Sequence, residues 1–463
     1  MSALTKKWLT PLFLTTIIAP TFAAAQSLEQ AVATALDGHP ELRIALSKFK
    51  VAEEKAKQAR AGYLPTIDLT AGYGYEQTDS PATRRGINAD DDGQAGLKRG
   101  EFGLSLKQML FDGFYTSHES SRTEFEASAE QWALFSAAED IALEVVKSYT
   151  SVLETKEVLA LSQKNLASHQ DIFSQIKERT DSGLGSVADL SQVTGRLARA
   201  NVNVISATNN YRDSVAAFIK VVNQQPENLV TPVPDADMLP TKQEAGLQDA
   251  IANHPTIRSA TSDIESARYA TKSAGASNYP TITFEIDANL NNNTGGEEGI
   301  DRVGNDVGGH TNNAAAMLRL KYNLYSGSRH SSQKREAAYR ITEAVEINSK
   351  AHRDVTEGYT LAWNAYELLD MQMNYIQKHV ESSKSTQSAY EQQFRLGQRS
   401  LLDLLDTENE LFEARKDYLS AEIQQLVAQY RLLNATGQLL DSLRVTRSPL
   451  WSGDRDYQQG VTK

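Results

Sequence analysis

Four short stretches of the chain alternate apolar and polar residues with a period of two. In order along the chain they are residues 66–76, 101–109, 281–290 and 314–324. In the first of them, the apolar positions Ile67, Leu69 and Tyr73 are separated by Asp68, Thr70 and Gly72. Because successive side chains of a strand point to opposite faces, each stretch predicts a β-strand with one apolar and one polar face.

Each stretch has about the 9–11 residues that a tilted membrane strand requires. A half-buried sheet of a soluble protein would show the same alternation. The polar face here carries charged residues, including Lys107, Glu285 and Arg319. These charges, together with the export signal described below, favour the wall of a water-filled barrel.

The rest of the chain has the pattern of very long helices. Residues 82–225 and 281–448 contain no proline, a residue that would cost roughly 3 kcal/mol inside a helix. Apolar residues recur at three- and four-residue spacing, as at Val145, Tyr149 and Val152. A helix over about 114–181 would be on the order of 100 Å long. The narrow apolar stripe and dense charges predict coiled-coil packing.

The chain contains an internal duplication. His39-Pro40 recurs as His254-Pro255, and Pro65-Thr66-Ile67 recurs as Pro280-Thr281-Ile282. Each half therefore holds one copy of the same unit: a helix, a strand pair and a long helical hairpin. We expect repeats at 26–225 and 248–437, a linker at 226–247, a C-terminal equatorial or tail segment at 438–463, strand pairs at about 66–76 with 101–110 and 281–290 with 314–324, and hairpin turns near 183–186 and 397–400.

Residues 1–25 are expected to be a signal peptide. Lys6 and Lys7 precede an apolar run that begins at Trp8, and small residues end at Ala25. This is the layout of a secretory signal. No later apolar stretch reaches the roughly 18 residues that a transmembrane helix needs. A membrane crossing would then require a closed barrel, because lipid cannot satisfy open sheet edges.

The composition excludes several classes of function. The formal net charge of −12 argues against a nucleic-acid partner. The chain has no cysteine, so it has no lipidated cysteine, disulfide or thiolate metal ligand. Its eight histidines are scattered, and it contains no nucleophile–base pair, HExxH helix or phosphate loop. We expect no enzyme activity, no cofactor and no metal site.

A long polar segment joins each strand pair, over residues 77–99 and 291–313. The acidic run Asp90–Gly93 is reminiscent of a calcium loop, but the EF-hand spacing and its closing Glu are absent. Solvated surface loops are expected. Four strands cannot close a barrel around a pore, since small barrels start near eight strands. The chain must therefore be an oligomer, in which two, three or four copies would supply about 8, 12 or 16 strands.

The duplicated layout, two Gly-x-x-Ser-x-x-Asp turns and the segment Phe394–Asn409 together resemble the TolC family of outer-membrane channel proteins. The resemblance covers about residues 28–440. It implies a mixed α and β fold and a homotrimer in which each chain gives four membrane strands to a shared twelve-stranded barrel. A long α-helical coiled-coil tube would continue into the periplasm and close at its inner end.

The two turns have a structural interpretation of their own. Gly183 and Gly397 suit the left-handed position that ends a helix. Ser186 and Ser400 are then expected to cap the next helix, with an aspartate near the capping-box position of each.

The resemblance adds a gating role to these turns. Asp403 and Asp406 match the acidic positions that ring the periplasmic entrance. Lying three residues apart on one helix face, they would bring up to six carboxylates together in a trimer and favour cations. Arg399 and Phe394 fall where the family has a basic and an aromatic residue that close the tip, with Asp189 as the expected partner. Phe394 replaces the expected tyrosine, so its contact should be weaker or purely apolar.

The function implied by the resemblance is a passive exit duct. Its partners would be outer-membrane lipid, a periplasmic adaptor of the membrane fusion type and an inner-membrane transporter. We favour type I protein secretion, with multidrug or small-molecule efflux as the alternative. A periplasmic coiled-coil adaptor is an alternative of a different class. It predicts one hairpin flanked by soluble β domains, whereas this chain duplicates the hairpin and the strand pair.

Overall fold

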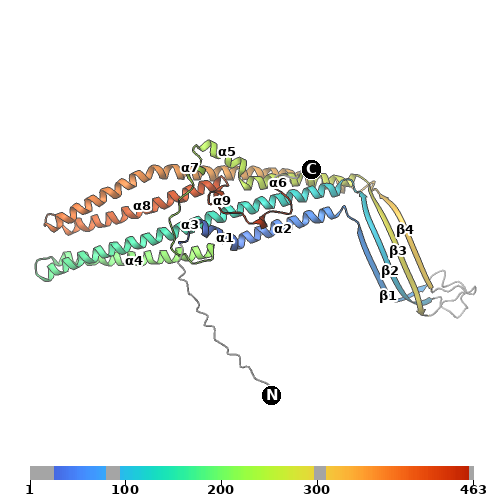
Figure 1. The fold of residues 1–463 in the computed structure, drawn as a ribbon, viewed down its shortest axis with the longest axis horizontal. Coiled ribbons are helices and arrows are strands. Elements are labelled where there is room, and N and C mark those ends of the chain that lie inside the picture. The colour runs from blue at the N-terminus through green and yellow to red at the C-terminus, as the bar shows by residue number, and fades with distance from the viewer. Residues whose placement is uncertain (1–24, 80–93, 297–308, 458–463) are drawn as a thin grey trace, which may run out of the picture. The chain divides into compact units, whose positions relative to one another are not determined.

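A computed structural model describes residues 25–79, 94–296 and 309–457 (Figure 1). The expected signal peptide, apart from Ala25, lies outside these residues, and so does most of each expected loop, including Asp90–Gly93. The elements are, in chain order, α1 (Leu28–Gly38), α2 (Pro40–Ala61), β1 (Thr66–Asp79), β2 (Gln94–Phe111), α3 (Tyr115–Asp181), α4 (Val187–Val222), the 3₁₀ turn η1 (Ala236–Met238), α5 (Gln243–Asn253), α6 (Pro255–Gly275), η2 (Ala276–Asn278), β3 (Thr281–Gly296), β4 (Gly309–Lys321), α7 (Arg329–Arg395), α8 (Leu401–Ala435), α9 (Leu439–Ser442) and η3 (Pro449–Trp451). Within the described ranges, none of these helices combines the length and apolar character needed to cross a membrane.

The four strands form one antiparallel sheet in the order β1-β2-β3-β4 (Figure 1). Strand β2 of the first repeat pairs with β3 of the second, so the two predicted strand pairs join edge to edge. The register places Leu69 beside Leu104 on one face and Lys107 beside Glu285 on the other. The apolar face is exposed along most of its length in the single chain, as at Leu69. Strands β1 and β4 are the free edges of this sheet.

The strand ends differ from the sequence prediction. Strand pairing continues to Asp79 and Gly296, because polar and glycine residues beyond the apolar alternation still form backbone ladders. Strand β4 instead ends at Lys321, before the predicted end at residue 324. The side chain of Asn323 accepts a hydrogen bond from the backbone N–H of Tyr325 at 3.0 Å. This local turn competes with strand pairing and ends β4.

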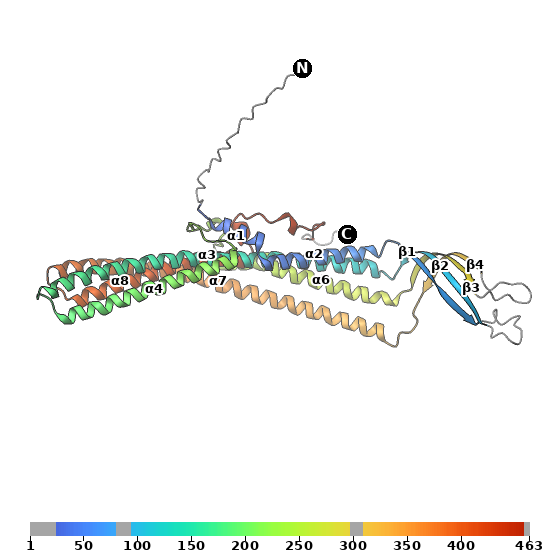
Figure 2. The ribbon, with the colours of Figure 1, turned by 90° about the horizontal axis from the view of Figure 1, so that it is seen from below.

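The chain falls into two compact units, each with parts of both repeats. The first unit comprises residues up to Gly38, Glu144–Pro234 and Leu369–Val427. Its main elements are two hairpins, in which α3 lies along α4 and α7 lies along α8 (Figure 2). Tyr149 is fully buried, and its hydroxyl lies 2.7 Å from the carbonyl oxygens of Gln26 and Val230. These contacts tie the segments around Gln26 and Val230 to α3.

The second unit comprises His39–Leu143, Asp235–Leu368 and the chain from Ala428 onward. It contains the sheet, α2, α5, α6 and the adjoining parts of the long helices. A hydrophobic cluster in this unit contains Tyr359 and Leu432, which are fully buried, and Ile257, which is 5% exposed. Helices α3, α7 and α8 each have residues in both units. They can continue without a break because these stretches of the sequence contain no proline.

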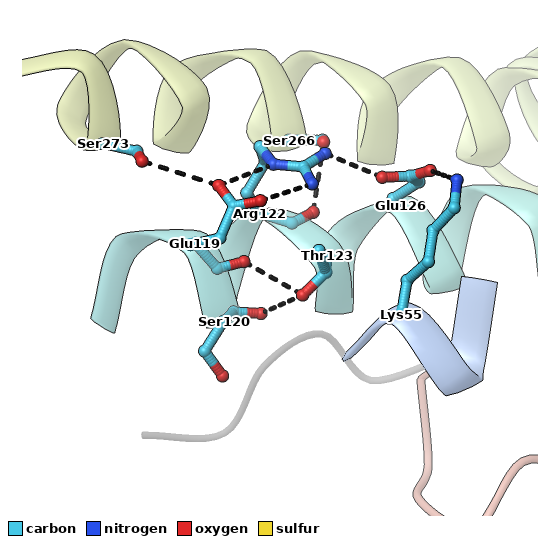
Figure 3. A network of polar contacts seen from close by, with 8 residues as sticks. All are labelled: Lys55, Glu119, Ser120, Arg122, Thr123, Glu126, Ser266 and Ser273. Carbon is cyan, nitrogen blue, oxygen red and sulfur yellow. Dashed lines mark hydrogen bonds and ion pairs between the residues drawn. The ribbon is translucent and has the colours of Figure 1, made fainter. Parts of the chain in front are cut away.

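Arg122 on α3 organises a polar network that involves α2, α3 and α6 (Figure 3). It donates to both oxygens of Glu119, at 2.7 and 2.9 Å, and to Glu126 at 2.7 Å. Lys55 of α2 donates to Glu126, and Ser266 of α6 donates to the Arg122 carbonyl. Burial opposes ionisation of Glu126, but the hydrogen bonds from Lys55 and Arg122 prevail and hold its pKa below the usual value. The network fastens α2 and α6 to α3.

The C-terminal segment is fastened to α3 by buried polar side chains. The carboxyl group of Glu139 accepts backbone hydrogen bonds from Leu439 at 3.0 Å and Leu440 at 3.4 Å. Further along, Gln131 donates to the carbonyl of Trp451 at 2.9 Å. Because these side chains satisfy backbone groups that the short segment cannot pair internally, the segment keeps a defined path along the helix.

The hairpin tip as candidate functional site

The two hairpin turns have the same backbone design. Gly183 follows α3 with φ of +74°, and Gly397 follows α7 with φ of +73°. These are left-handed conformations that glycine adopts without steric cost. After the first turn, Ser186 caps α4 by accepting from the N–H of Ala188 at 3.1 Å.

The second turn has a reciprocal cap. The Ser400 hydroxyl accepts from the N–H of Asp403 at 3.2 Å, and the Asp403 carboxylate accepts from the N–H of Ser400 at 3.4 Å. This arrangement is a capping box, with aspartate in the position usually taken by glutamate or glutamine. Asp403 therefore has a structural role in starting α8, separate from any role of its charge.

An apolar cluster joins the two hairpins at the tip. The first hairpin supplies Ile172, Ile176 and Val193, and the second supplies Leu401, Leu404 and Leu405. Phe394 is partly buried against this cluster, so its aromatic ring makes an apolar contact here. Water is excluded around these side chains, and separating the hairpins would expose them.

An ion pair lies beside the cluster. The Arg196 guanidinium on α4 donates to the Asp406 carboxylate on α8 at 2.7 Å. Among the described residues of the first unit, this is the one side-chain hydrogen bond between the two hairpins. Asp406, which the sequence analysis assigned to an acidic ring, thus has a cationic partner from the same chain.

Arg399 makes its contacts within its own hairpin. Its Nε donates to Gln393 at 2.9 Å, and its guanidinium carbon lies 4.3 Å from the ring centre of Tyr390. One guanidinium nitrogen lies 3.9 Å from the Asp403 carboxylate. The described contacts of Arg399 do not include Asp189, the partner expected from the resemblance.

Two residues of this site, Tyr390 and Arg196, are not among those predicted from the sequence. Tyr390 supplies the aromatic surface under Arg399, and its position four residues before Phe394 on the same helix face was the available signal. Arg196 lies 210 residues from Asp406 and in the other repeat. No local motif marks such a pair, because it forms only when the two hairpins pack together.

The exposed apolar face of the sheet, the duplicated hairpins and the turn geometry define an outer-membrane channel protein with periplasmic helices. The chain belongs to the family described as Outer membrane efflux protein, whose profile matches residues 31–224 and 246–438. The two matched segments confirm the internal duplication. Members of this family are passive channels, and the protein is not an enzyme.

Individual relatives cover nearly the whole chain. It is 24% identical to the outer membrane efflux protein BepC of Brucella suis, over 92% of this chain and 88% of the relative. It is 23% identical to the outer membrane protein TolC of Vibrio cholerae, over 94% and 96%. The alkaline protease secretion protein AprF of Pseudomonas aeruginosa is 22% identical, over 88% and 83%.

Solved structures show the same fold. The Campylobacter jejuni CmeC outer membrane channel superposes with a TM-score of 0.75 at 14% identity, over 89% of this chain and 86% of that one. The predicted fold class, a duplicated helix, strand-pair and hairpin architecture, is thereby confirmed.

Proposed function

We propose that three copies of this chain form the exit duct of a tripartite export system, which receives cargo from an inner-membrane transporter through a periplasmic adaptor. The sheet carries this proposal. Four strands with two free edges and an exposed apolar face form an incomplete barrel wall. Three copies give the twelve strands that the resemblance implies, and closure satisfies the backbone groups along β1 and β4.

Membrane fractionation tests the proposal. We expect the mature protein in the outer-membrane fraction as a trimer that resists detergent at room temperature and dissociates on heating. Recovery as a soluble periplasmic monomer would overturn it.

We further propose that Asp403 and Asp406 surround the periplasmic entrance, and that Arg399, Phe394 and Asp189 take part in closing it. The support is their common position at the end of the hairpins, around the turns at Gly183 and Gly397. Replacing both Asp403 and Asp406 by alanine should reduce cation selectivity and block by multivalent cations in planar bilayers. Unchanged selectivity and block would remove both residues from the entrance.

For the cargo we propose a secreted protein. One of the relatives is named for secretion of alkaline protease, and the chain has no cysteine to carry a lipid anchor. Another relative is named for efflux, so the two cargo classes need a direct comparison. A deletion strain should lose a specific protein from its culture medium and keep its susceptibility to toxic compounds. Increased susceptibility with an unchanged set of secreted proteins would assign efflux instead.

A further inference from the structure

The two acidic residues at the tip have partners of different origin. Asp403 lies 3.9 Å from Arg399, which is four residues earlier at the same turn. Asp406 is paired at 2.7 Å with Arg196, which belongs to the other hairpin. One pair is therefore internal to a hairpin, and the other pair joins two hairpins.

This difference matters when the hairpins move apart. Arg399 and Asp403 belong to the same turn and would travel together. Arg196 and Asp406 are on separate helices, so any widening between α4 and α8 beyond hydrogen-bond distance breaks their contact. Separation thus leaves the Asp406 carboxylate of each chain without its arginine, whereas Asp403 stays beside Arg399.

The pair matters for its charge more than for its strength. The side chains of Arg196 and Asp406 are 28% and 56% exposed. Exposed ion pairs of this kind contribute about 0–1 kcal/mol, so the adjoining apolar cluster dominates the cohesion of the hairpins. The two charges lie well within the roughly 8 Å Debye length of physiological salt. The positive charge of Arg196 therefore offsets the attraction of Asp406 for nearby cations.

His169, which interacts electrostatically with Arg196, does not add a second positive charge to the pair. His169 of α3 is buried, and burial, followed by the positive charge of Arg196, lowers its pKa. The histidine is therefore neutral near pH 7 and adds no positive charge beside Arg196.

We propose that Arg196 determines the ion selectivity of the entrance by masking Asp406 while the hairpins are together, so that hairpin separation unmasks one carboxylate per chain. The inference rests on the proposed function, because the carboxylates meet around a common axis only in the trimer. The groups attracted after separation are cationic: multivalent metal complexes, or basic side chains of a cargo.

Bilayer recordings of arginine variants test the inference. Arg196→Gln removes the masking charge, whereas Arg196→Lys retains it. Arg199→Gln is the matched control, because Arg199 lies three residues further along α4, is exposed and makes no side-chain polar contact among the described residues. The trimer yield of each variant, measured on unheated gels, verifies folding.

We expect Arg196→Gln to raise the cation-to-anion permeability ratio on the order of threefold. The concentration of hexaamminecobalt(III) that halves the current should fall by a similar factor. Arg196→Lys and Arg199→Gln should behave as wild type. Adding Asp406→Asn to Arg196→Gln should restore the wild-type ratio, because no carboxylate is left to unmask.

Equal shifts for Arg196→Gln and Arg199→Gln would overturn the inference, since they would show a general effect of helix charge. A shift that persists in the Arg196→Gln, Asp406→Asn double variant would also overturn it. These results differ from failure of the proposed function, in which the wild-type protein itself would form no conducting trimer.

Discussion

The carboxyl group of Glu139 accepts a hydrogen bond at 3.0 Å from the backbone nitrogen of Leu439, a residue 300 positions further along the chain. Glu139 is only 4% exposed. Burial raises its pKa to about 8, although the hydrogen bonds from Leu440 and Leu439 and the charge of Arg447 act in the opposite direction; the charge of Asp441 adds to the rise.

This pKa shift predicts that the protein loses stability as the pH rises. The folded chain keeps the Glu139 proton up to about pH 8, whereas the unfolded chain releases it near the ordinary value of 4.5. Stability therefore falls between these two values, by on the order of 3–5 kcal/mol per chain. The thermal unfolding midpoint in detergent should drop from pH 5 to pH 8.5 in wild type and much less in Glu139→Gln. The exposed control Glu144→Gln should retain the wild-type slope; an identical slope in Glu139→Gln would contradict the assignment.

The C-terminal segment should contribute to stability through Trp451. This side chain is 5% exposed, and the carbonyl of the same residue accepts from Gln131. Trp451→Ala should cost about 3–5 kcal/mol in the free energy of unfolding, because it leaves a large cavity against α3. The neighbouring Leu450 is 64% exposed, so Leu450→Ala should change the unfolding midpoint little. Similar losses in both variants would show that the segment is not specifically packed.

The apolar cluster at the tip should hold the two hairpins together. Leu405 is fully buried in this cluster, whereas Leu402, one turn away on the same helix, is 44% exposed. Leu405→Ala should weaken the cluster by about 2–5 kcal/mol and increase single-channel conductance, because the tip opens more readily. Leu402→Ala should conduct as wild type. Equal conductance of the two variants would argue against cluster-controlled opening.

Arg399 should restrain the second turn. Its contacts with Tyr390, Gln393 and Asp403 all lie within one hairpin. Arg399→Ala should therefore raise single-channel conductance modestly by loosening the turn. The matched control is Arg395→Ala, which removes an exposed ion pair with Glu391 on the same helix. A conductance change of the same size in the control would assign the effect to net charge.

Features set by neighbouring residues could be predicted from the sequence, whereas features set by residues distant in the sequence could not. The alternation from Ile67 to Tyr75 locates a strand because the pattern is local and repeats every two residues. The strand ends at Asp79 and Gly296 depend on ladder partners in other strands. Arg196 and Glu139 escaped prediction for the same reason. In the sequence, each is an ordinary ionisable residue of a long helix. Its partner lies hundreds of residues away along the chain.

If three copies share one barrel, the free edges β1 and β4 of the sheet meet between copies, and cysteine cross-linking can detect this contact. The wild-type chain has no cysteine to interfere. Within one sheet, β1 and β4 are three strand spacings apart, roughly 14 Å, which is too far for a disulfide. A disulfide between the two edges must therefore join different copies.

Thr70→Cys on β1 would be combined in turn with a cysteine at position 313, 315 or 317 of β4, which lie on the same face of the sheet as Thr70. On oxidation, at least one combination should give covalent dimers and trimers that withstand heating, and the single-cysteine variants should not. Monomers alone in every combination, from outer membranes that contain the protein, would contradict the shared barrel.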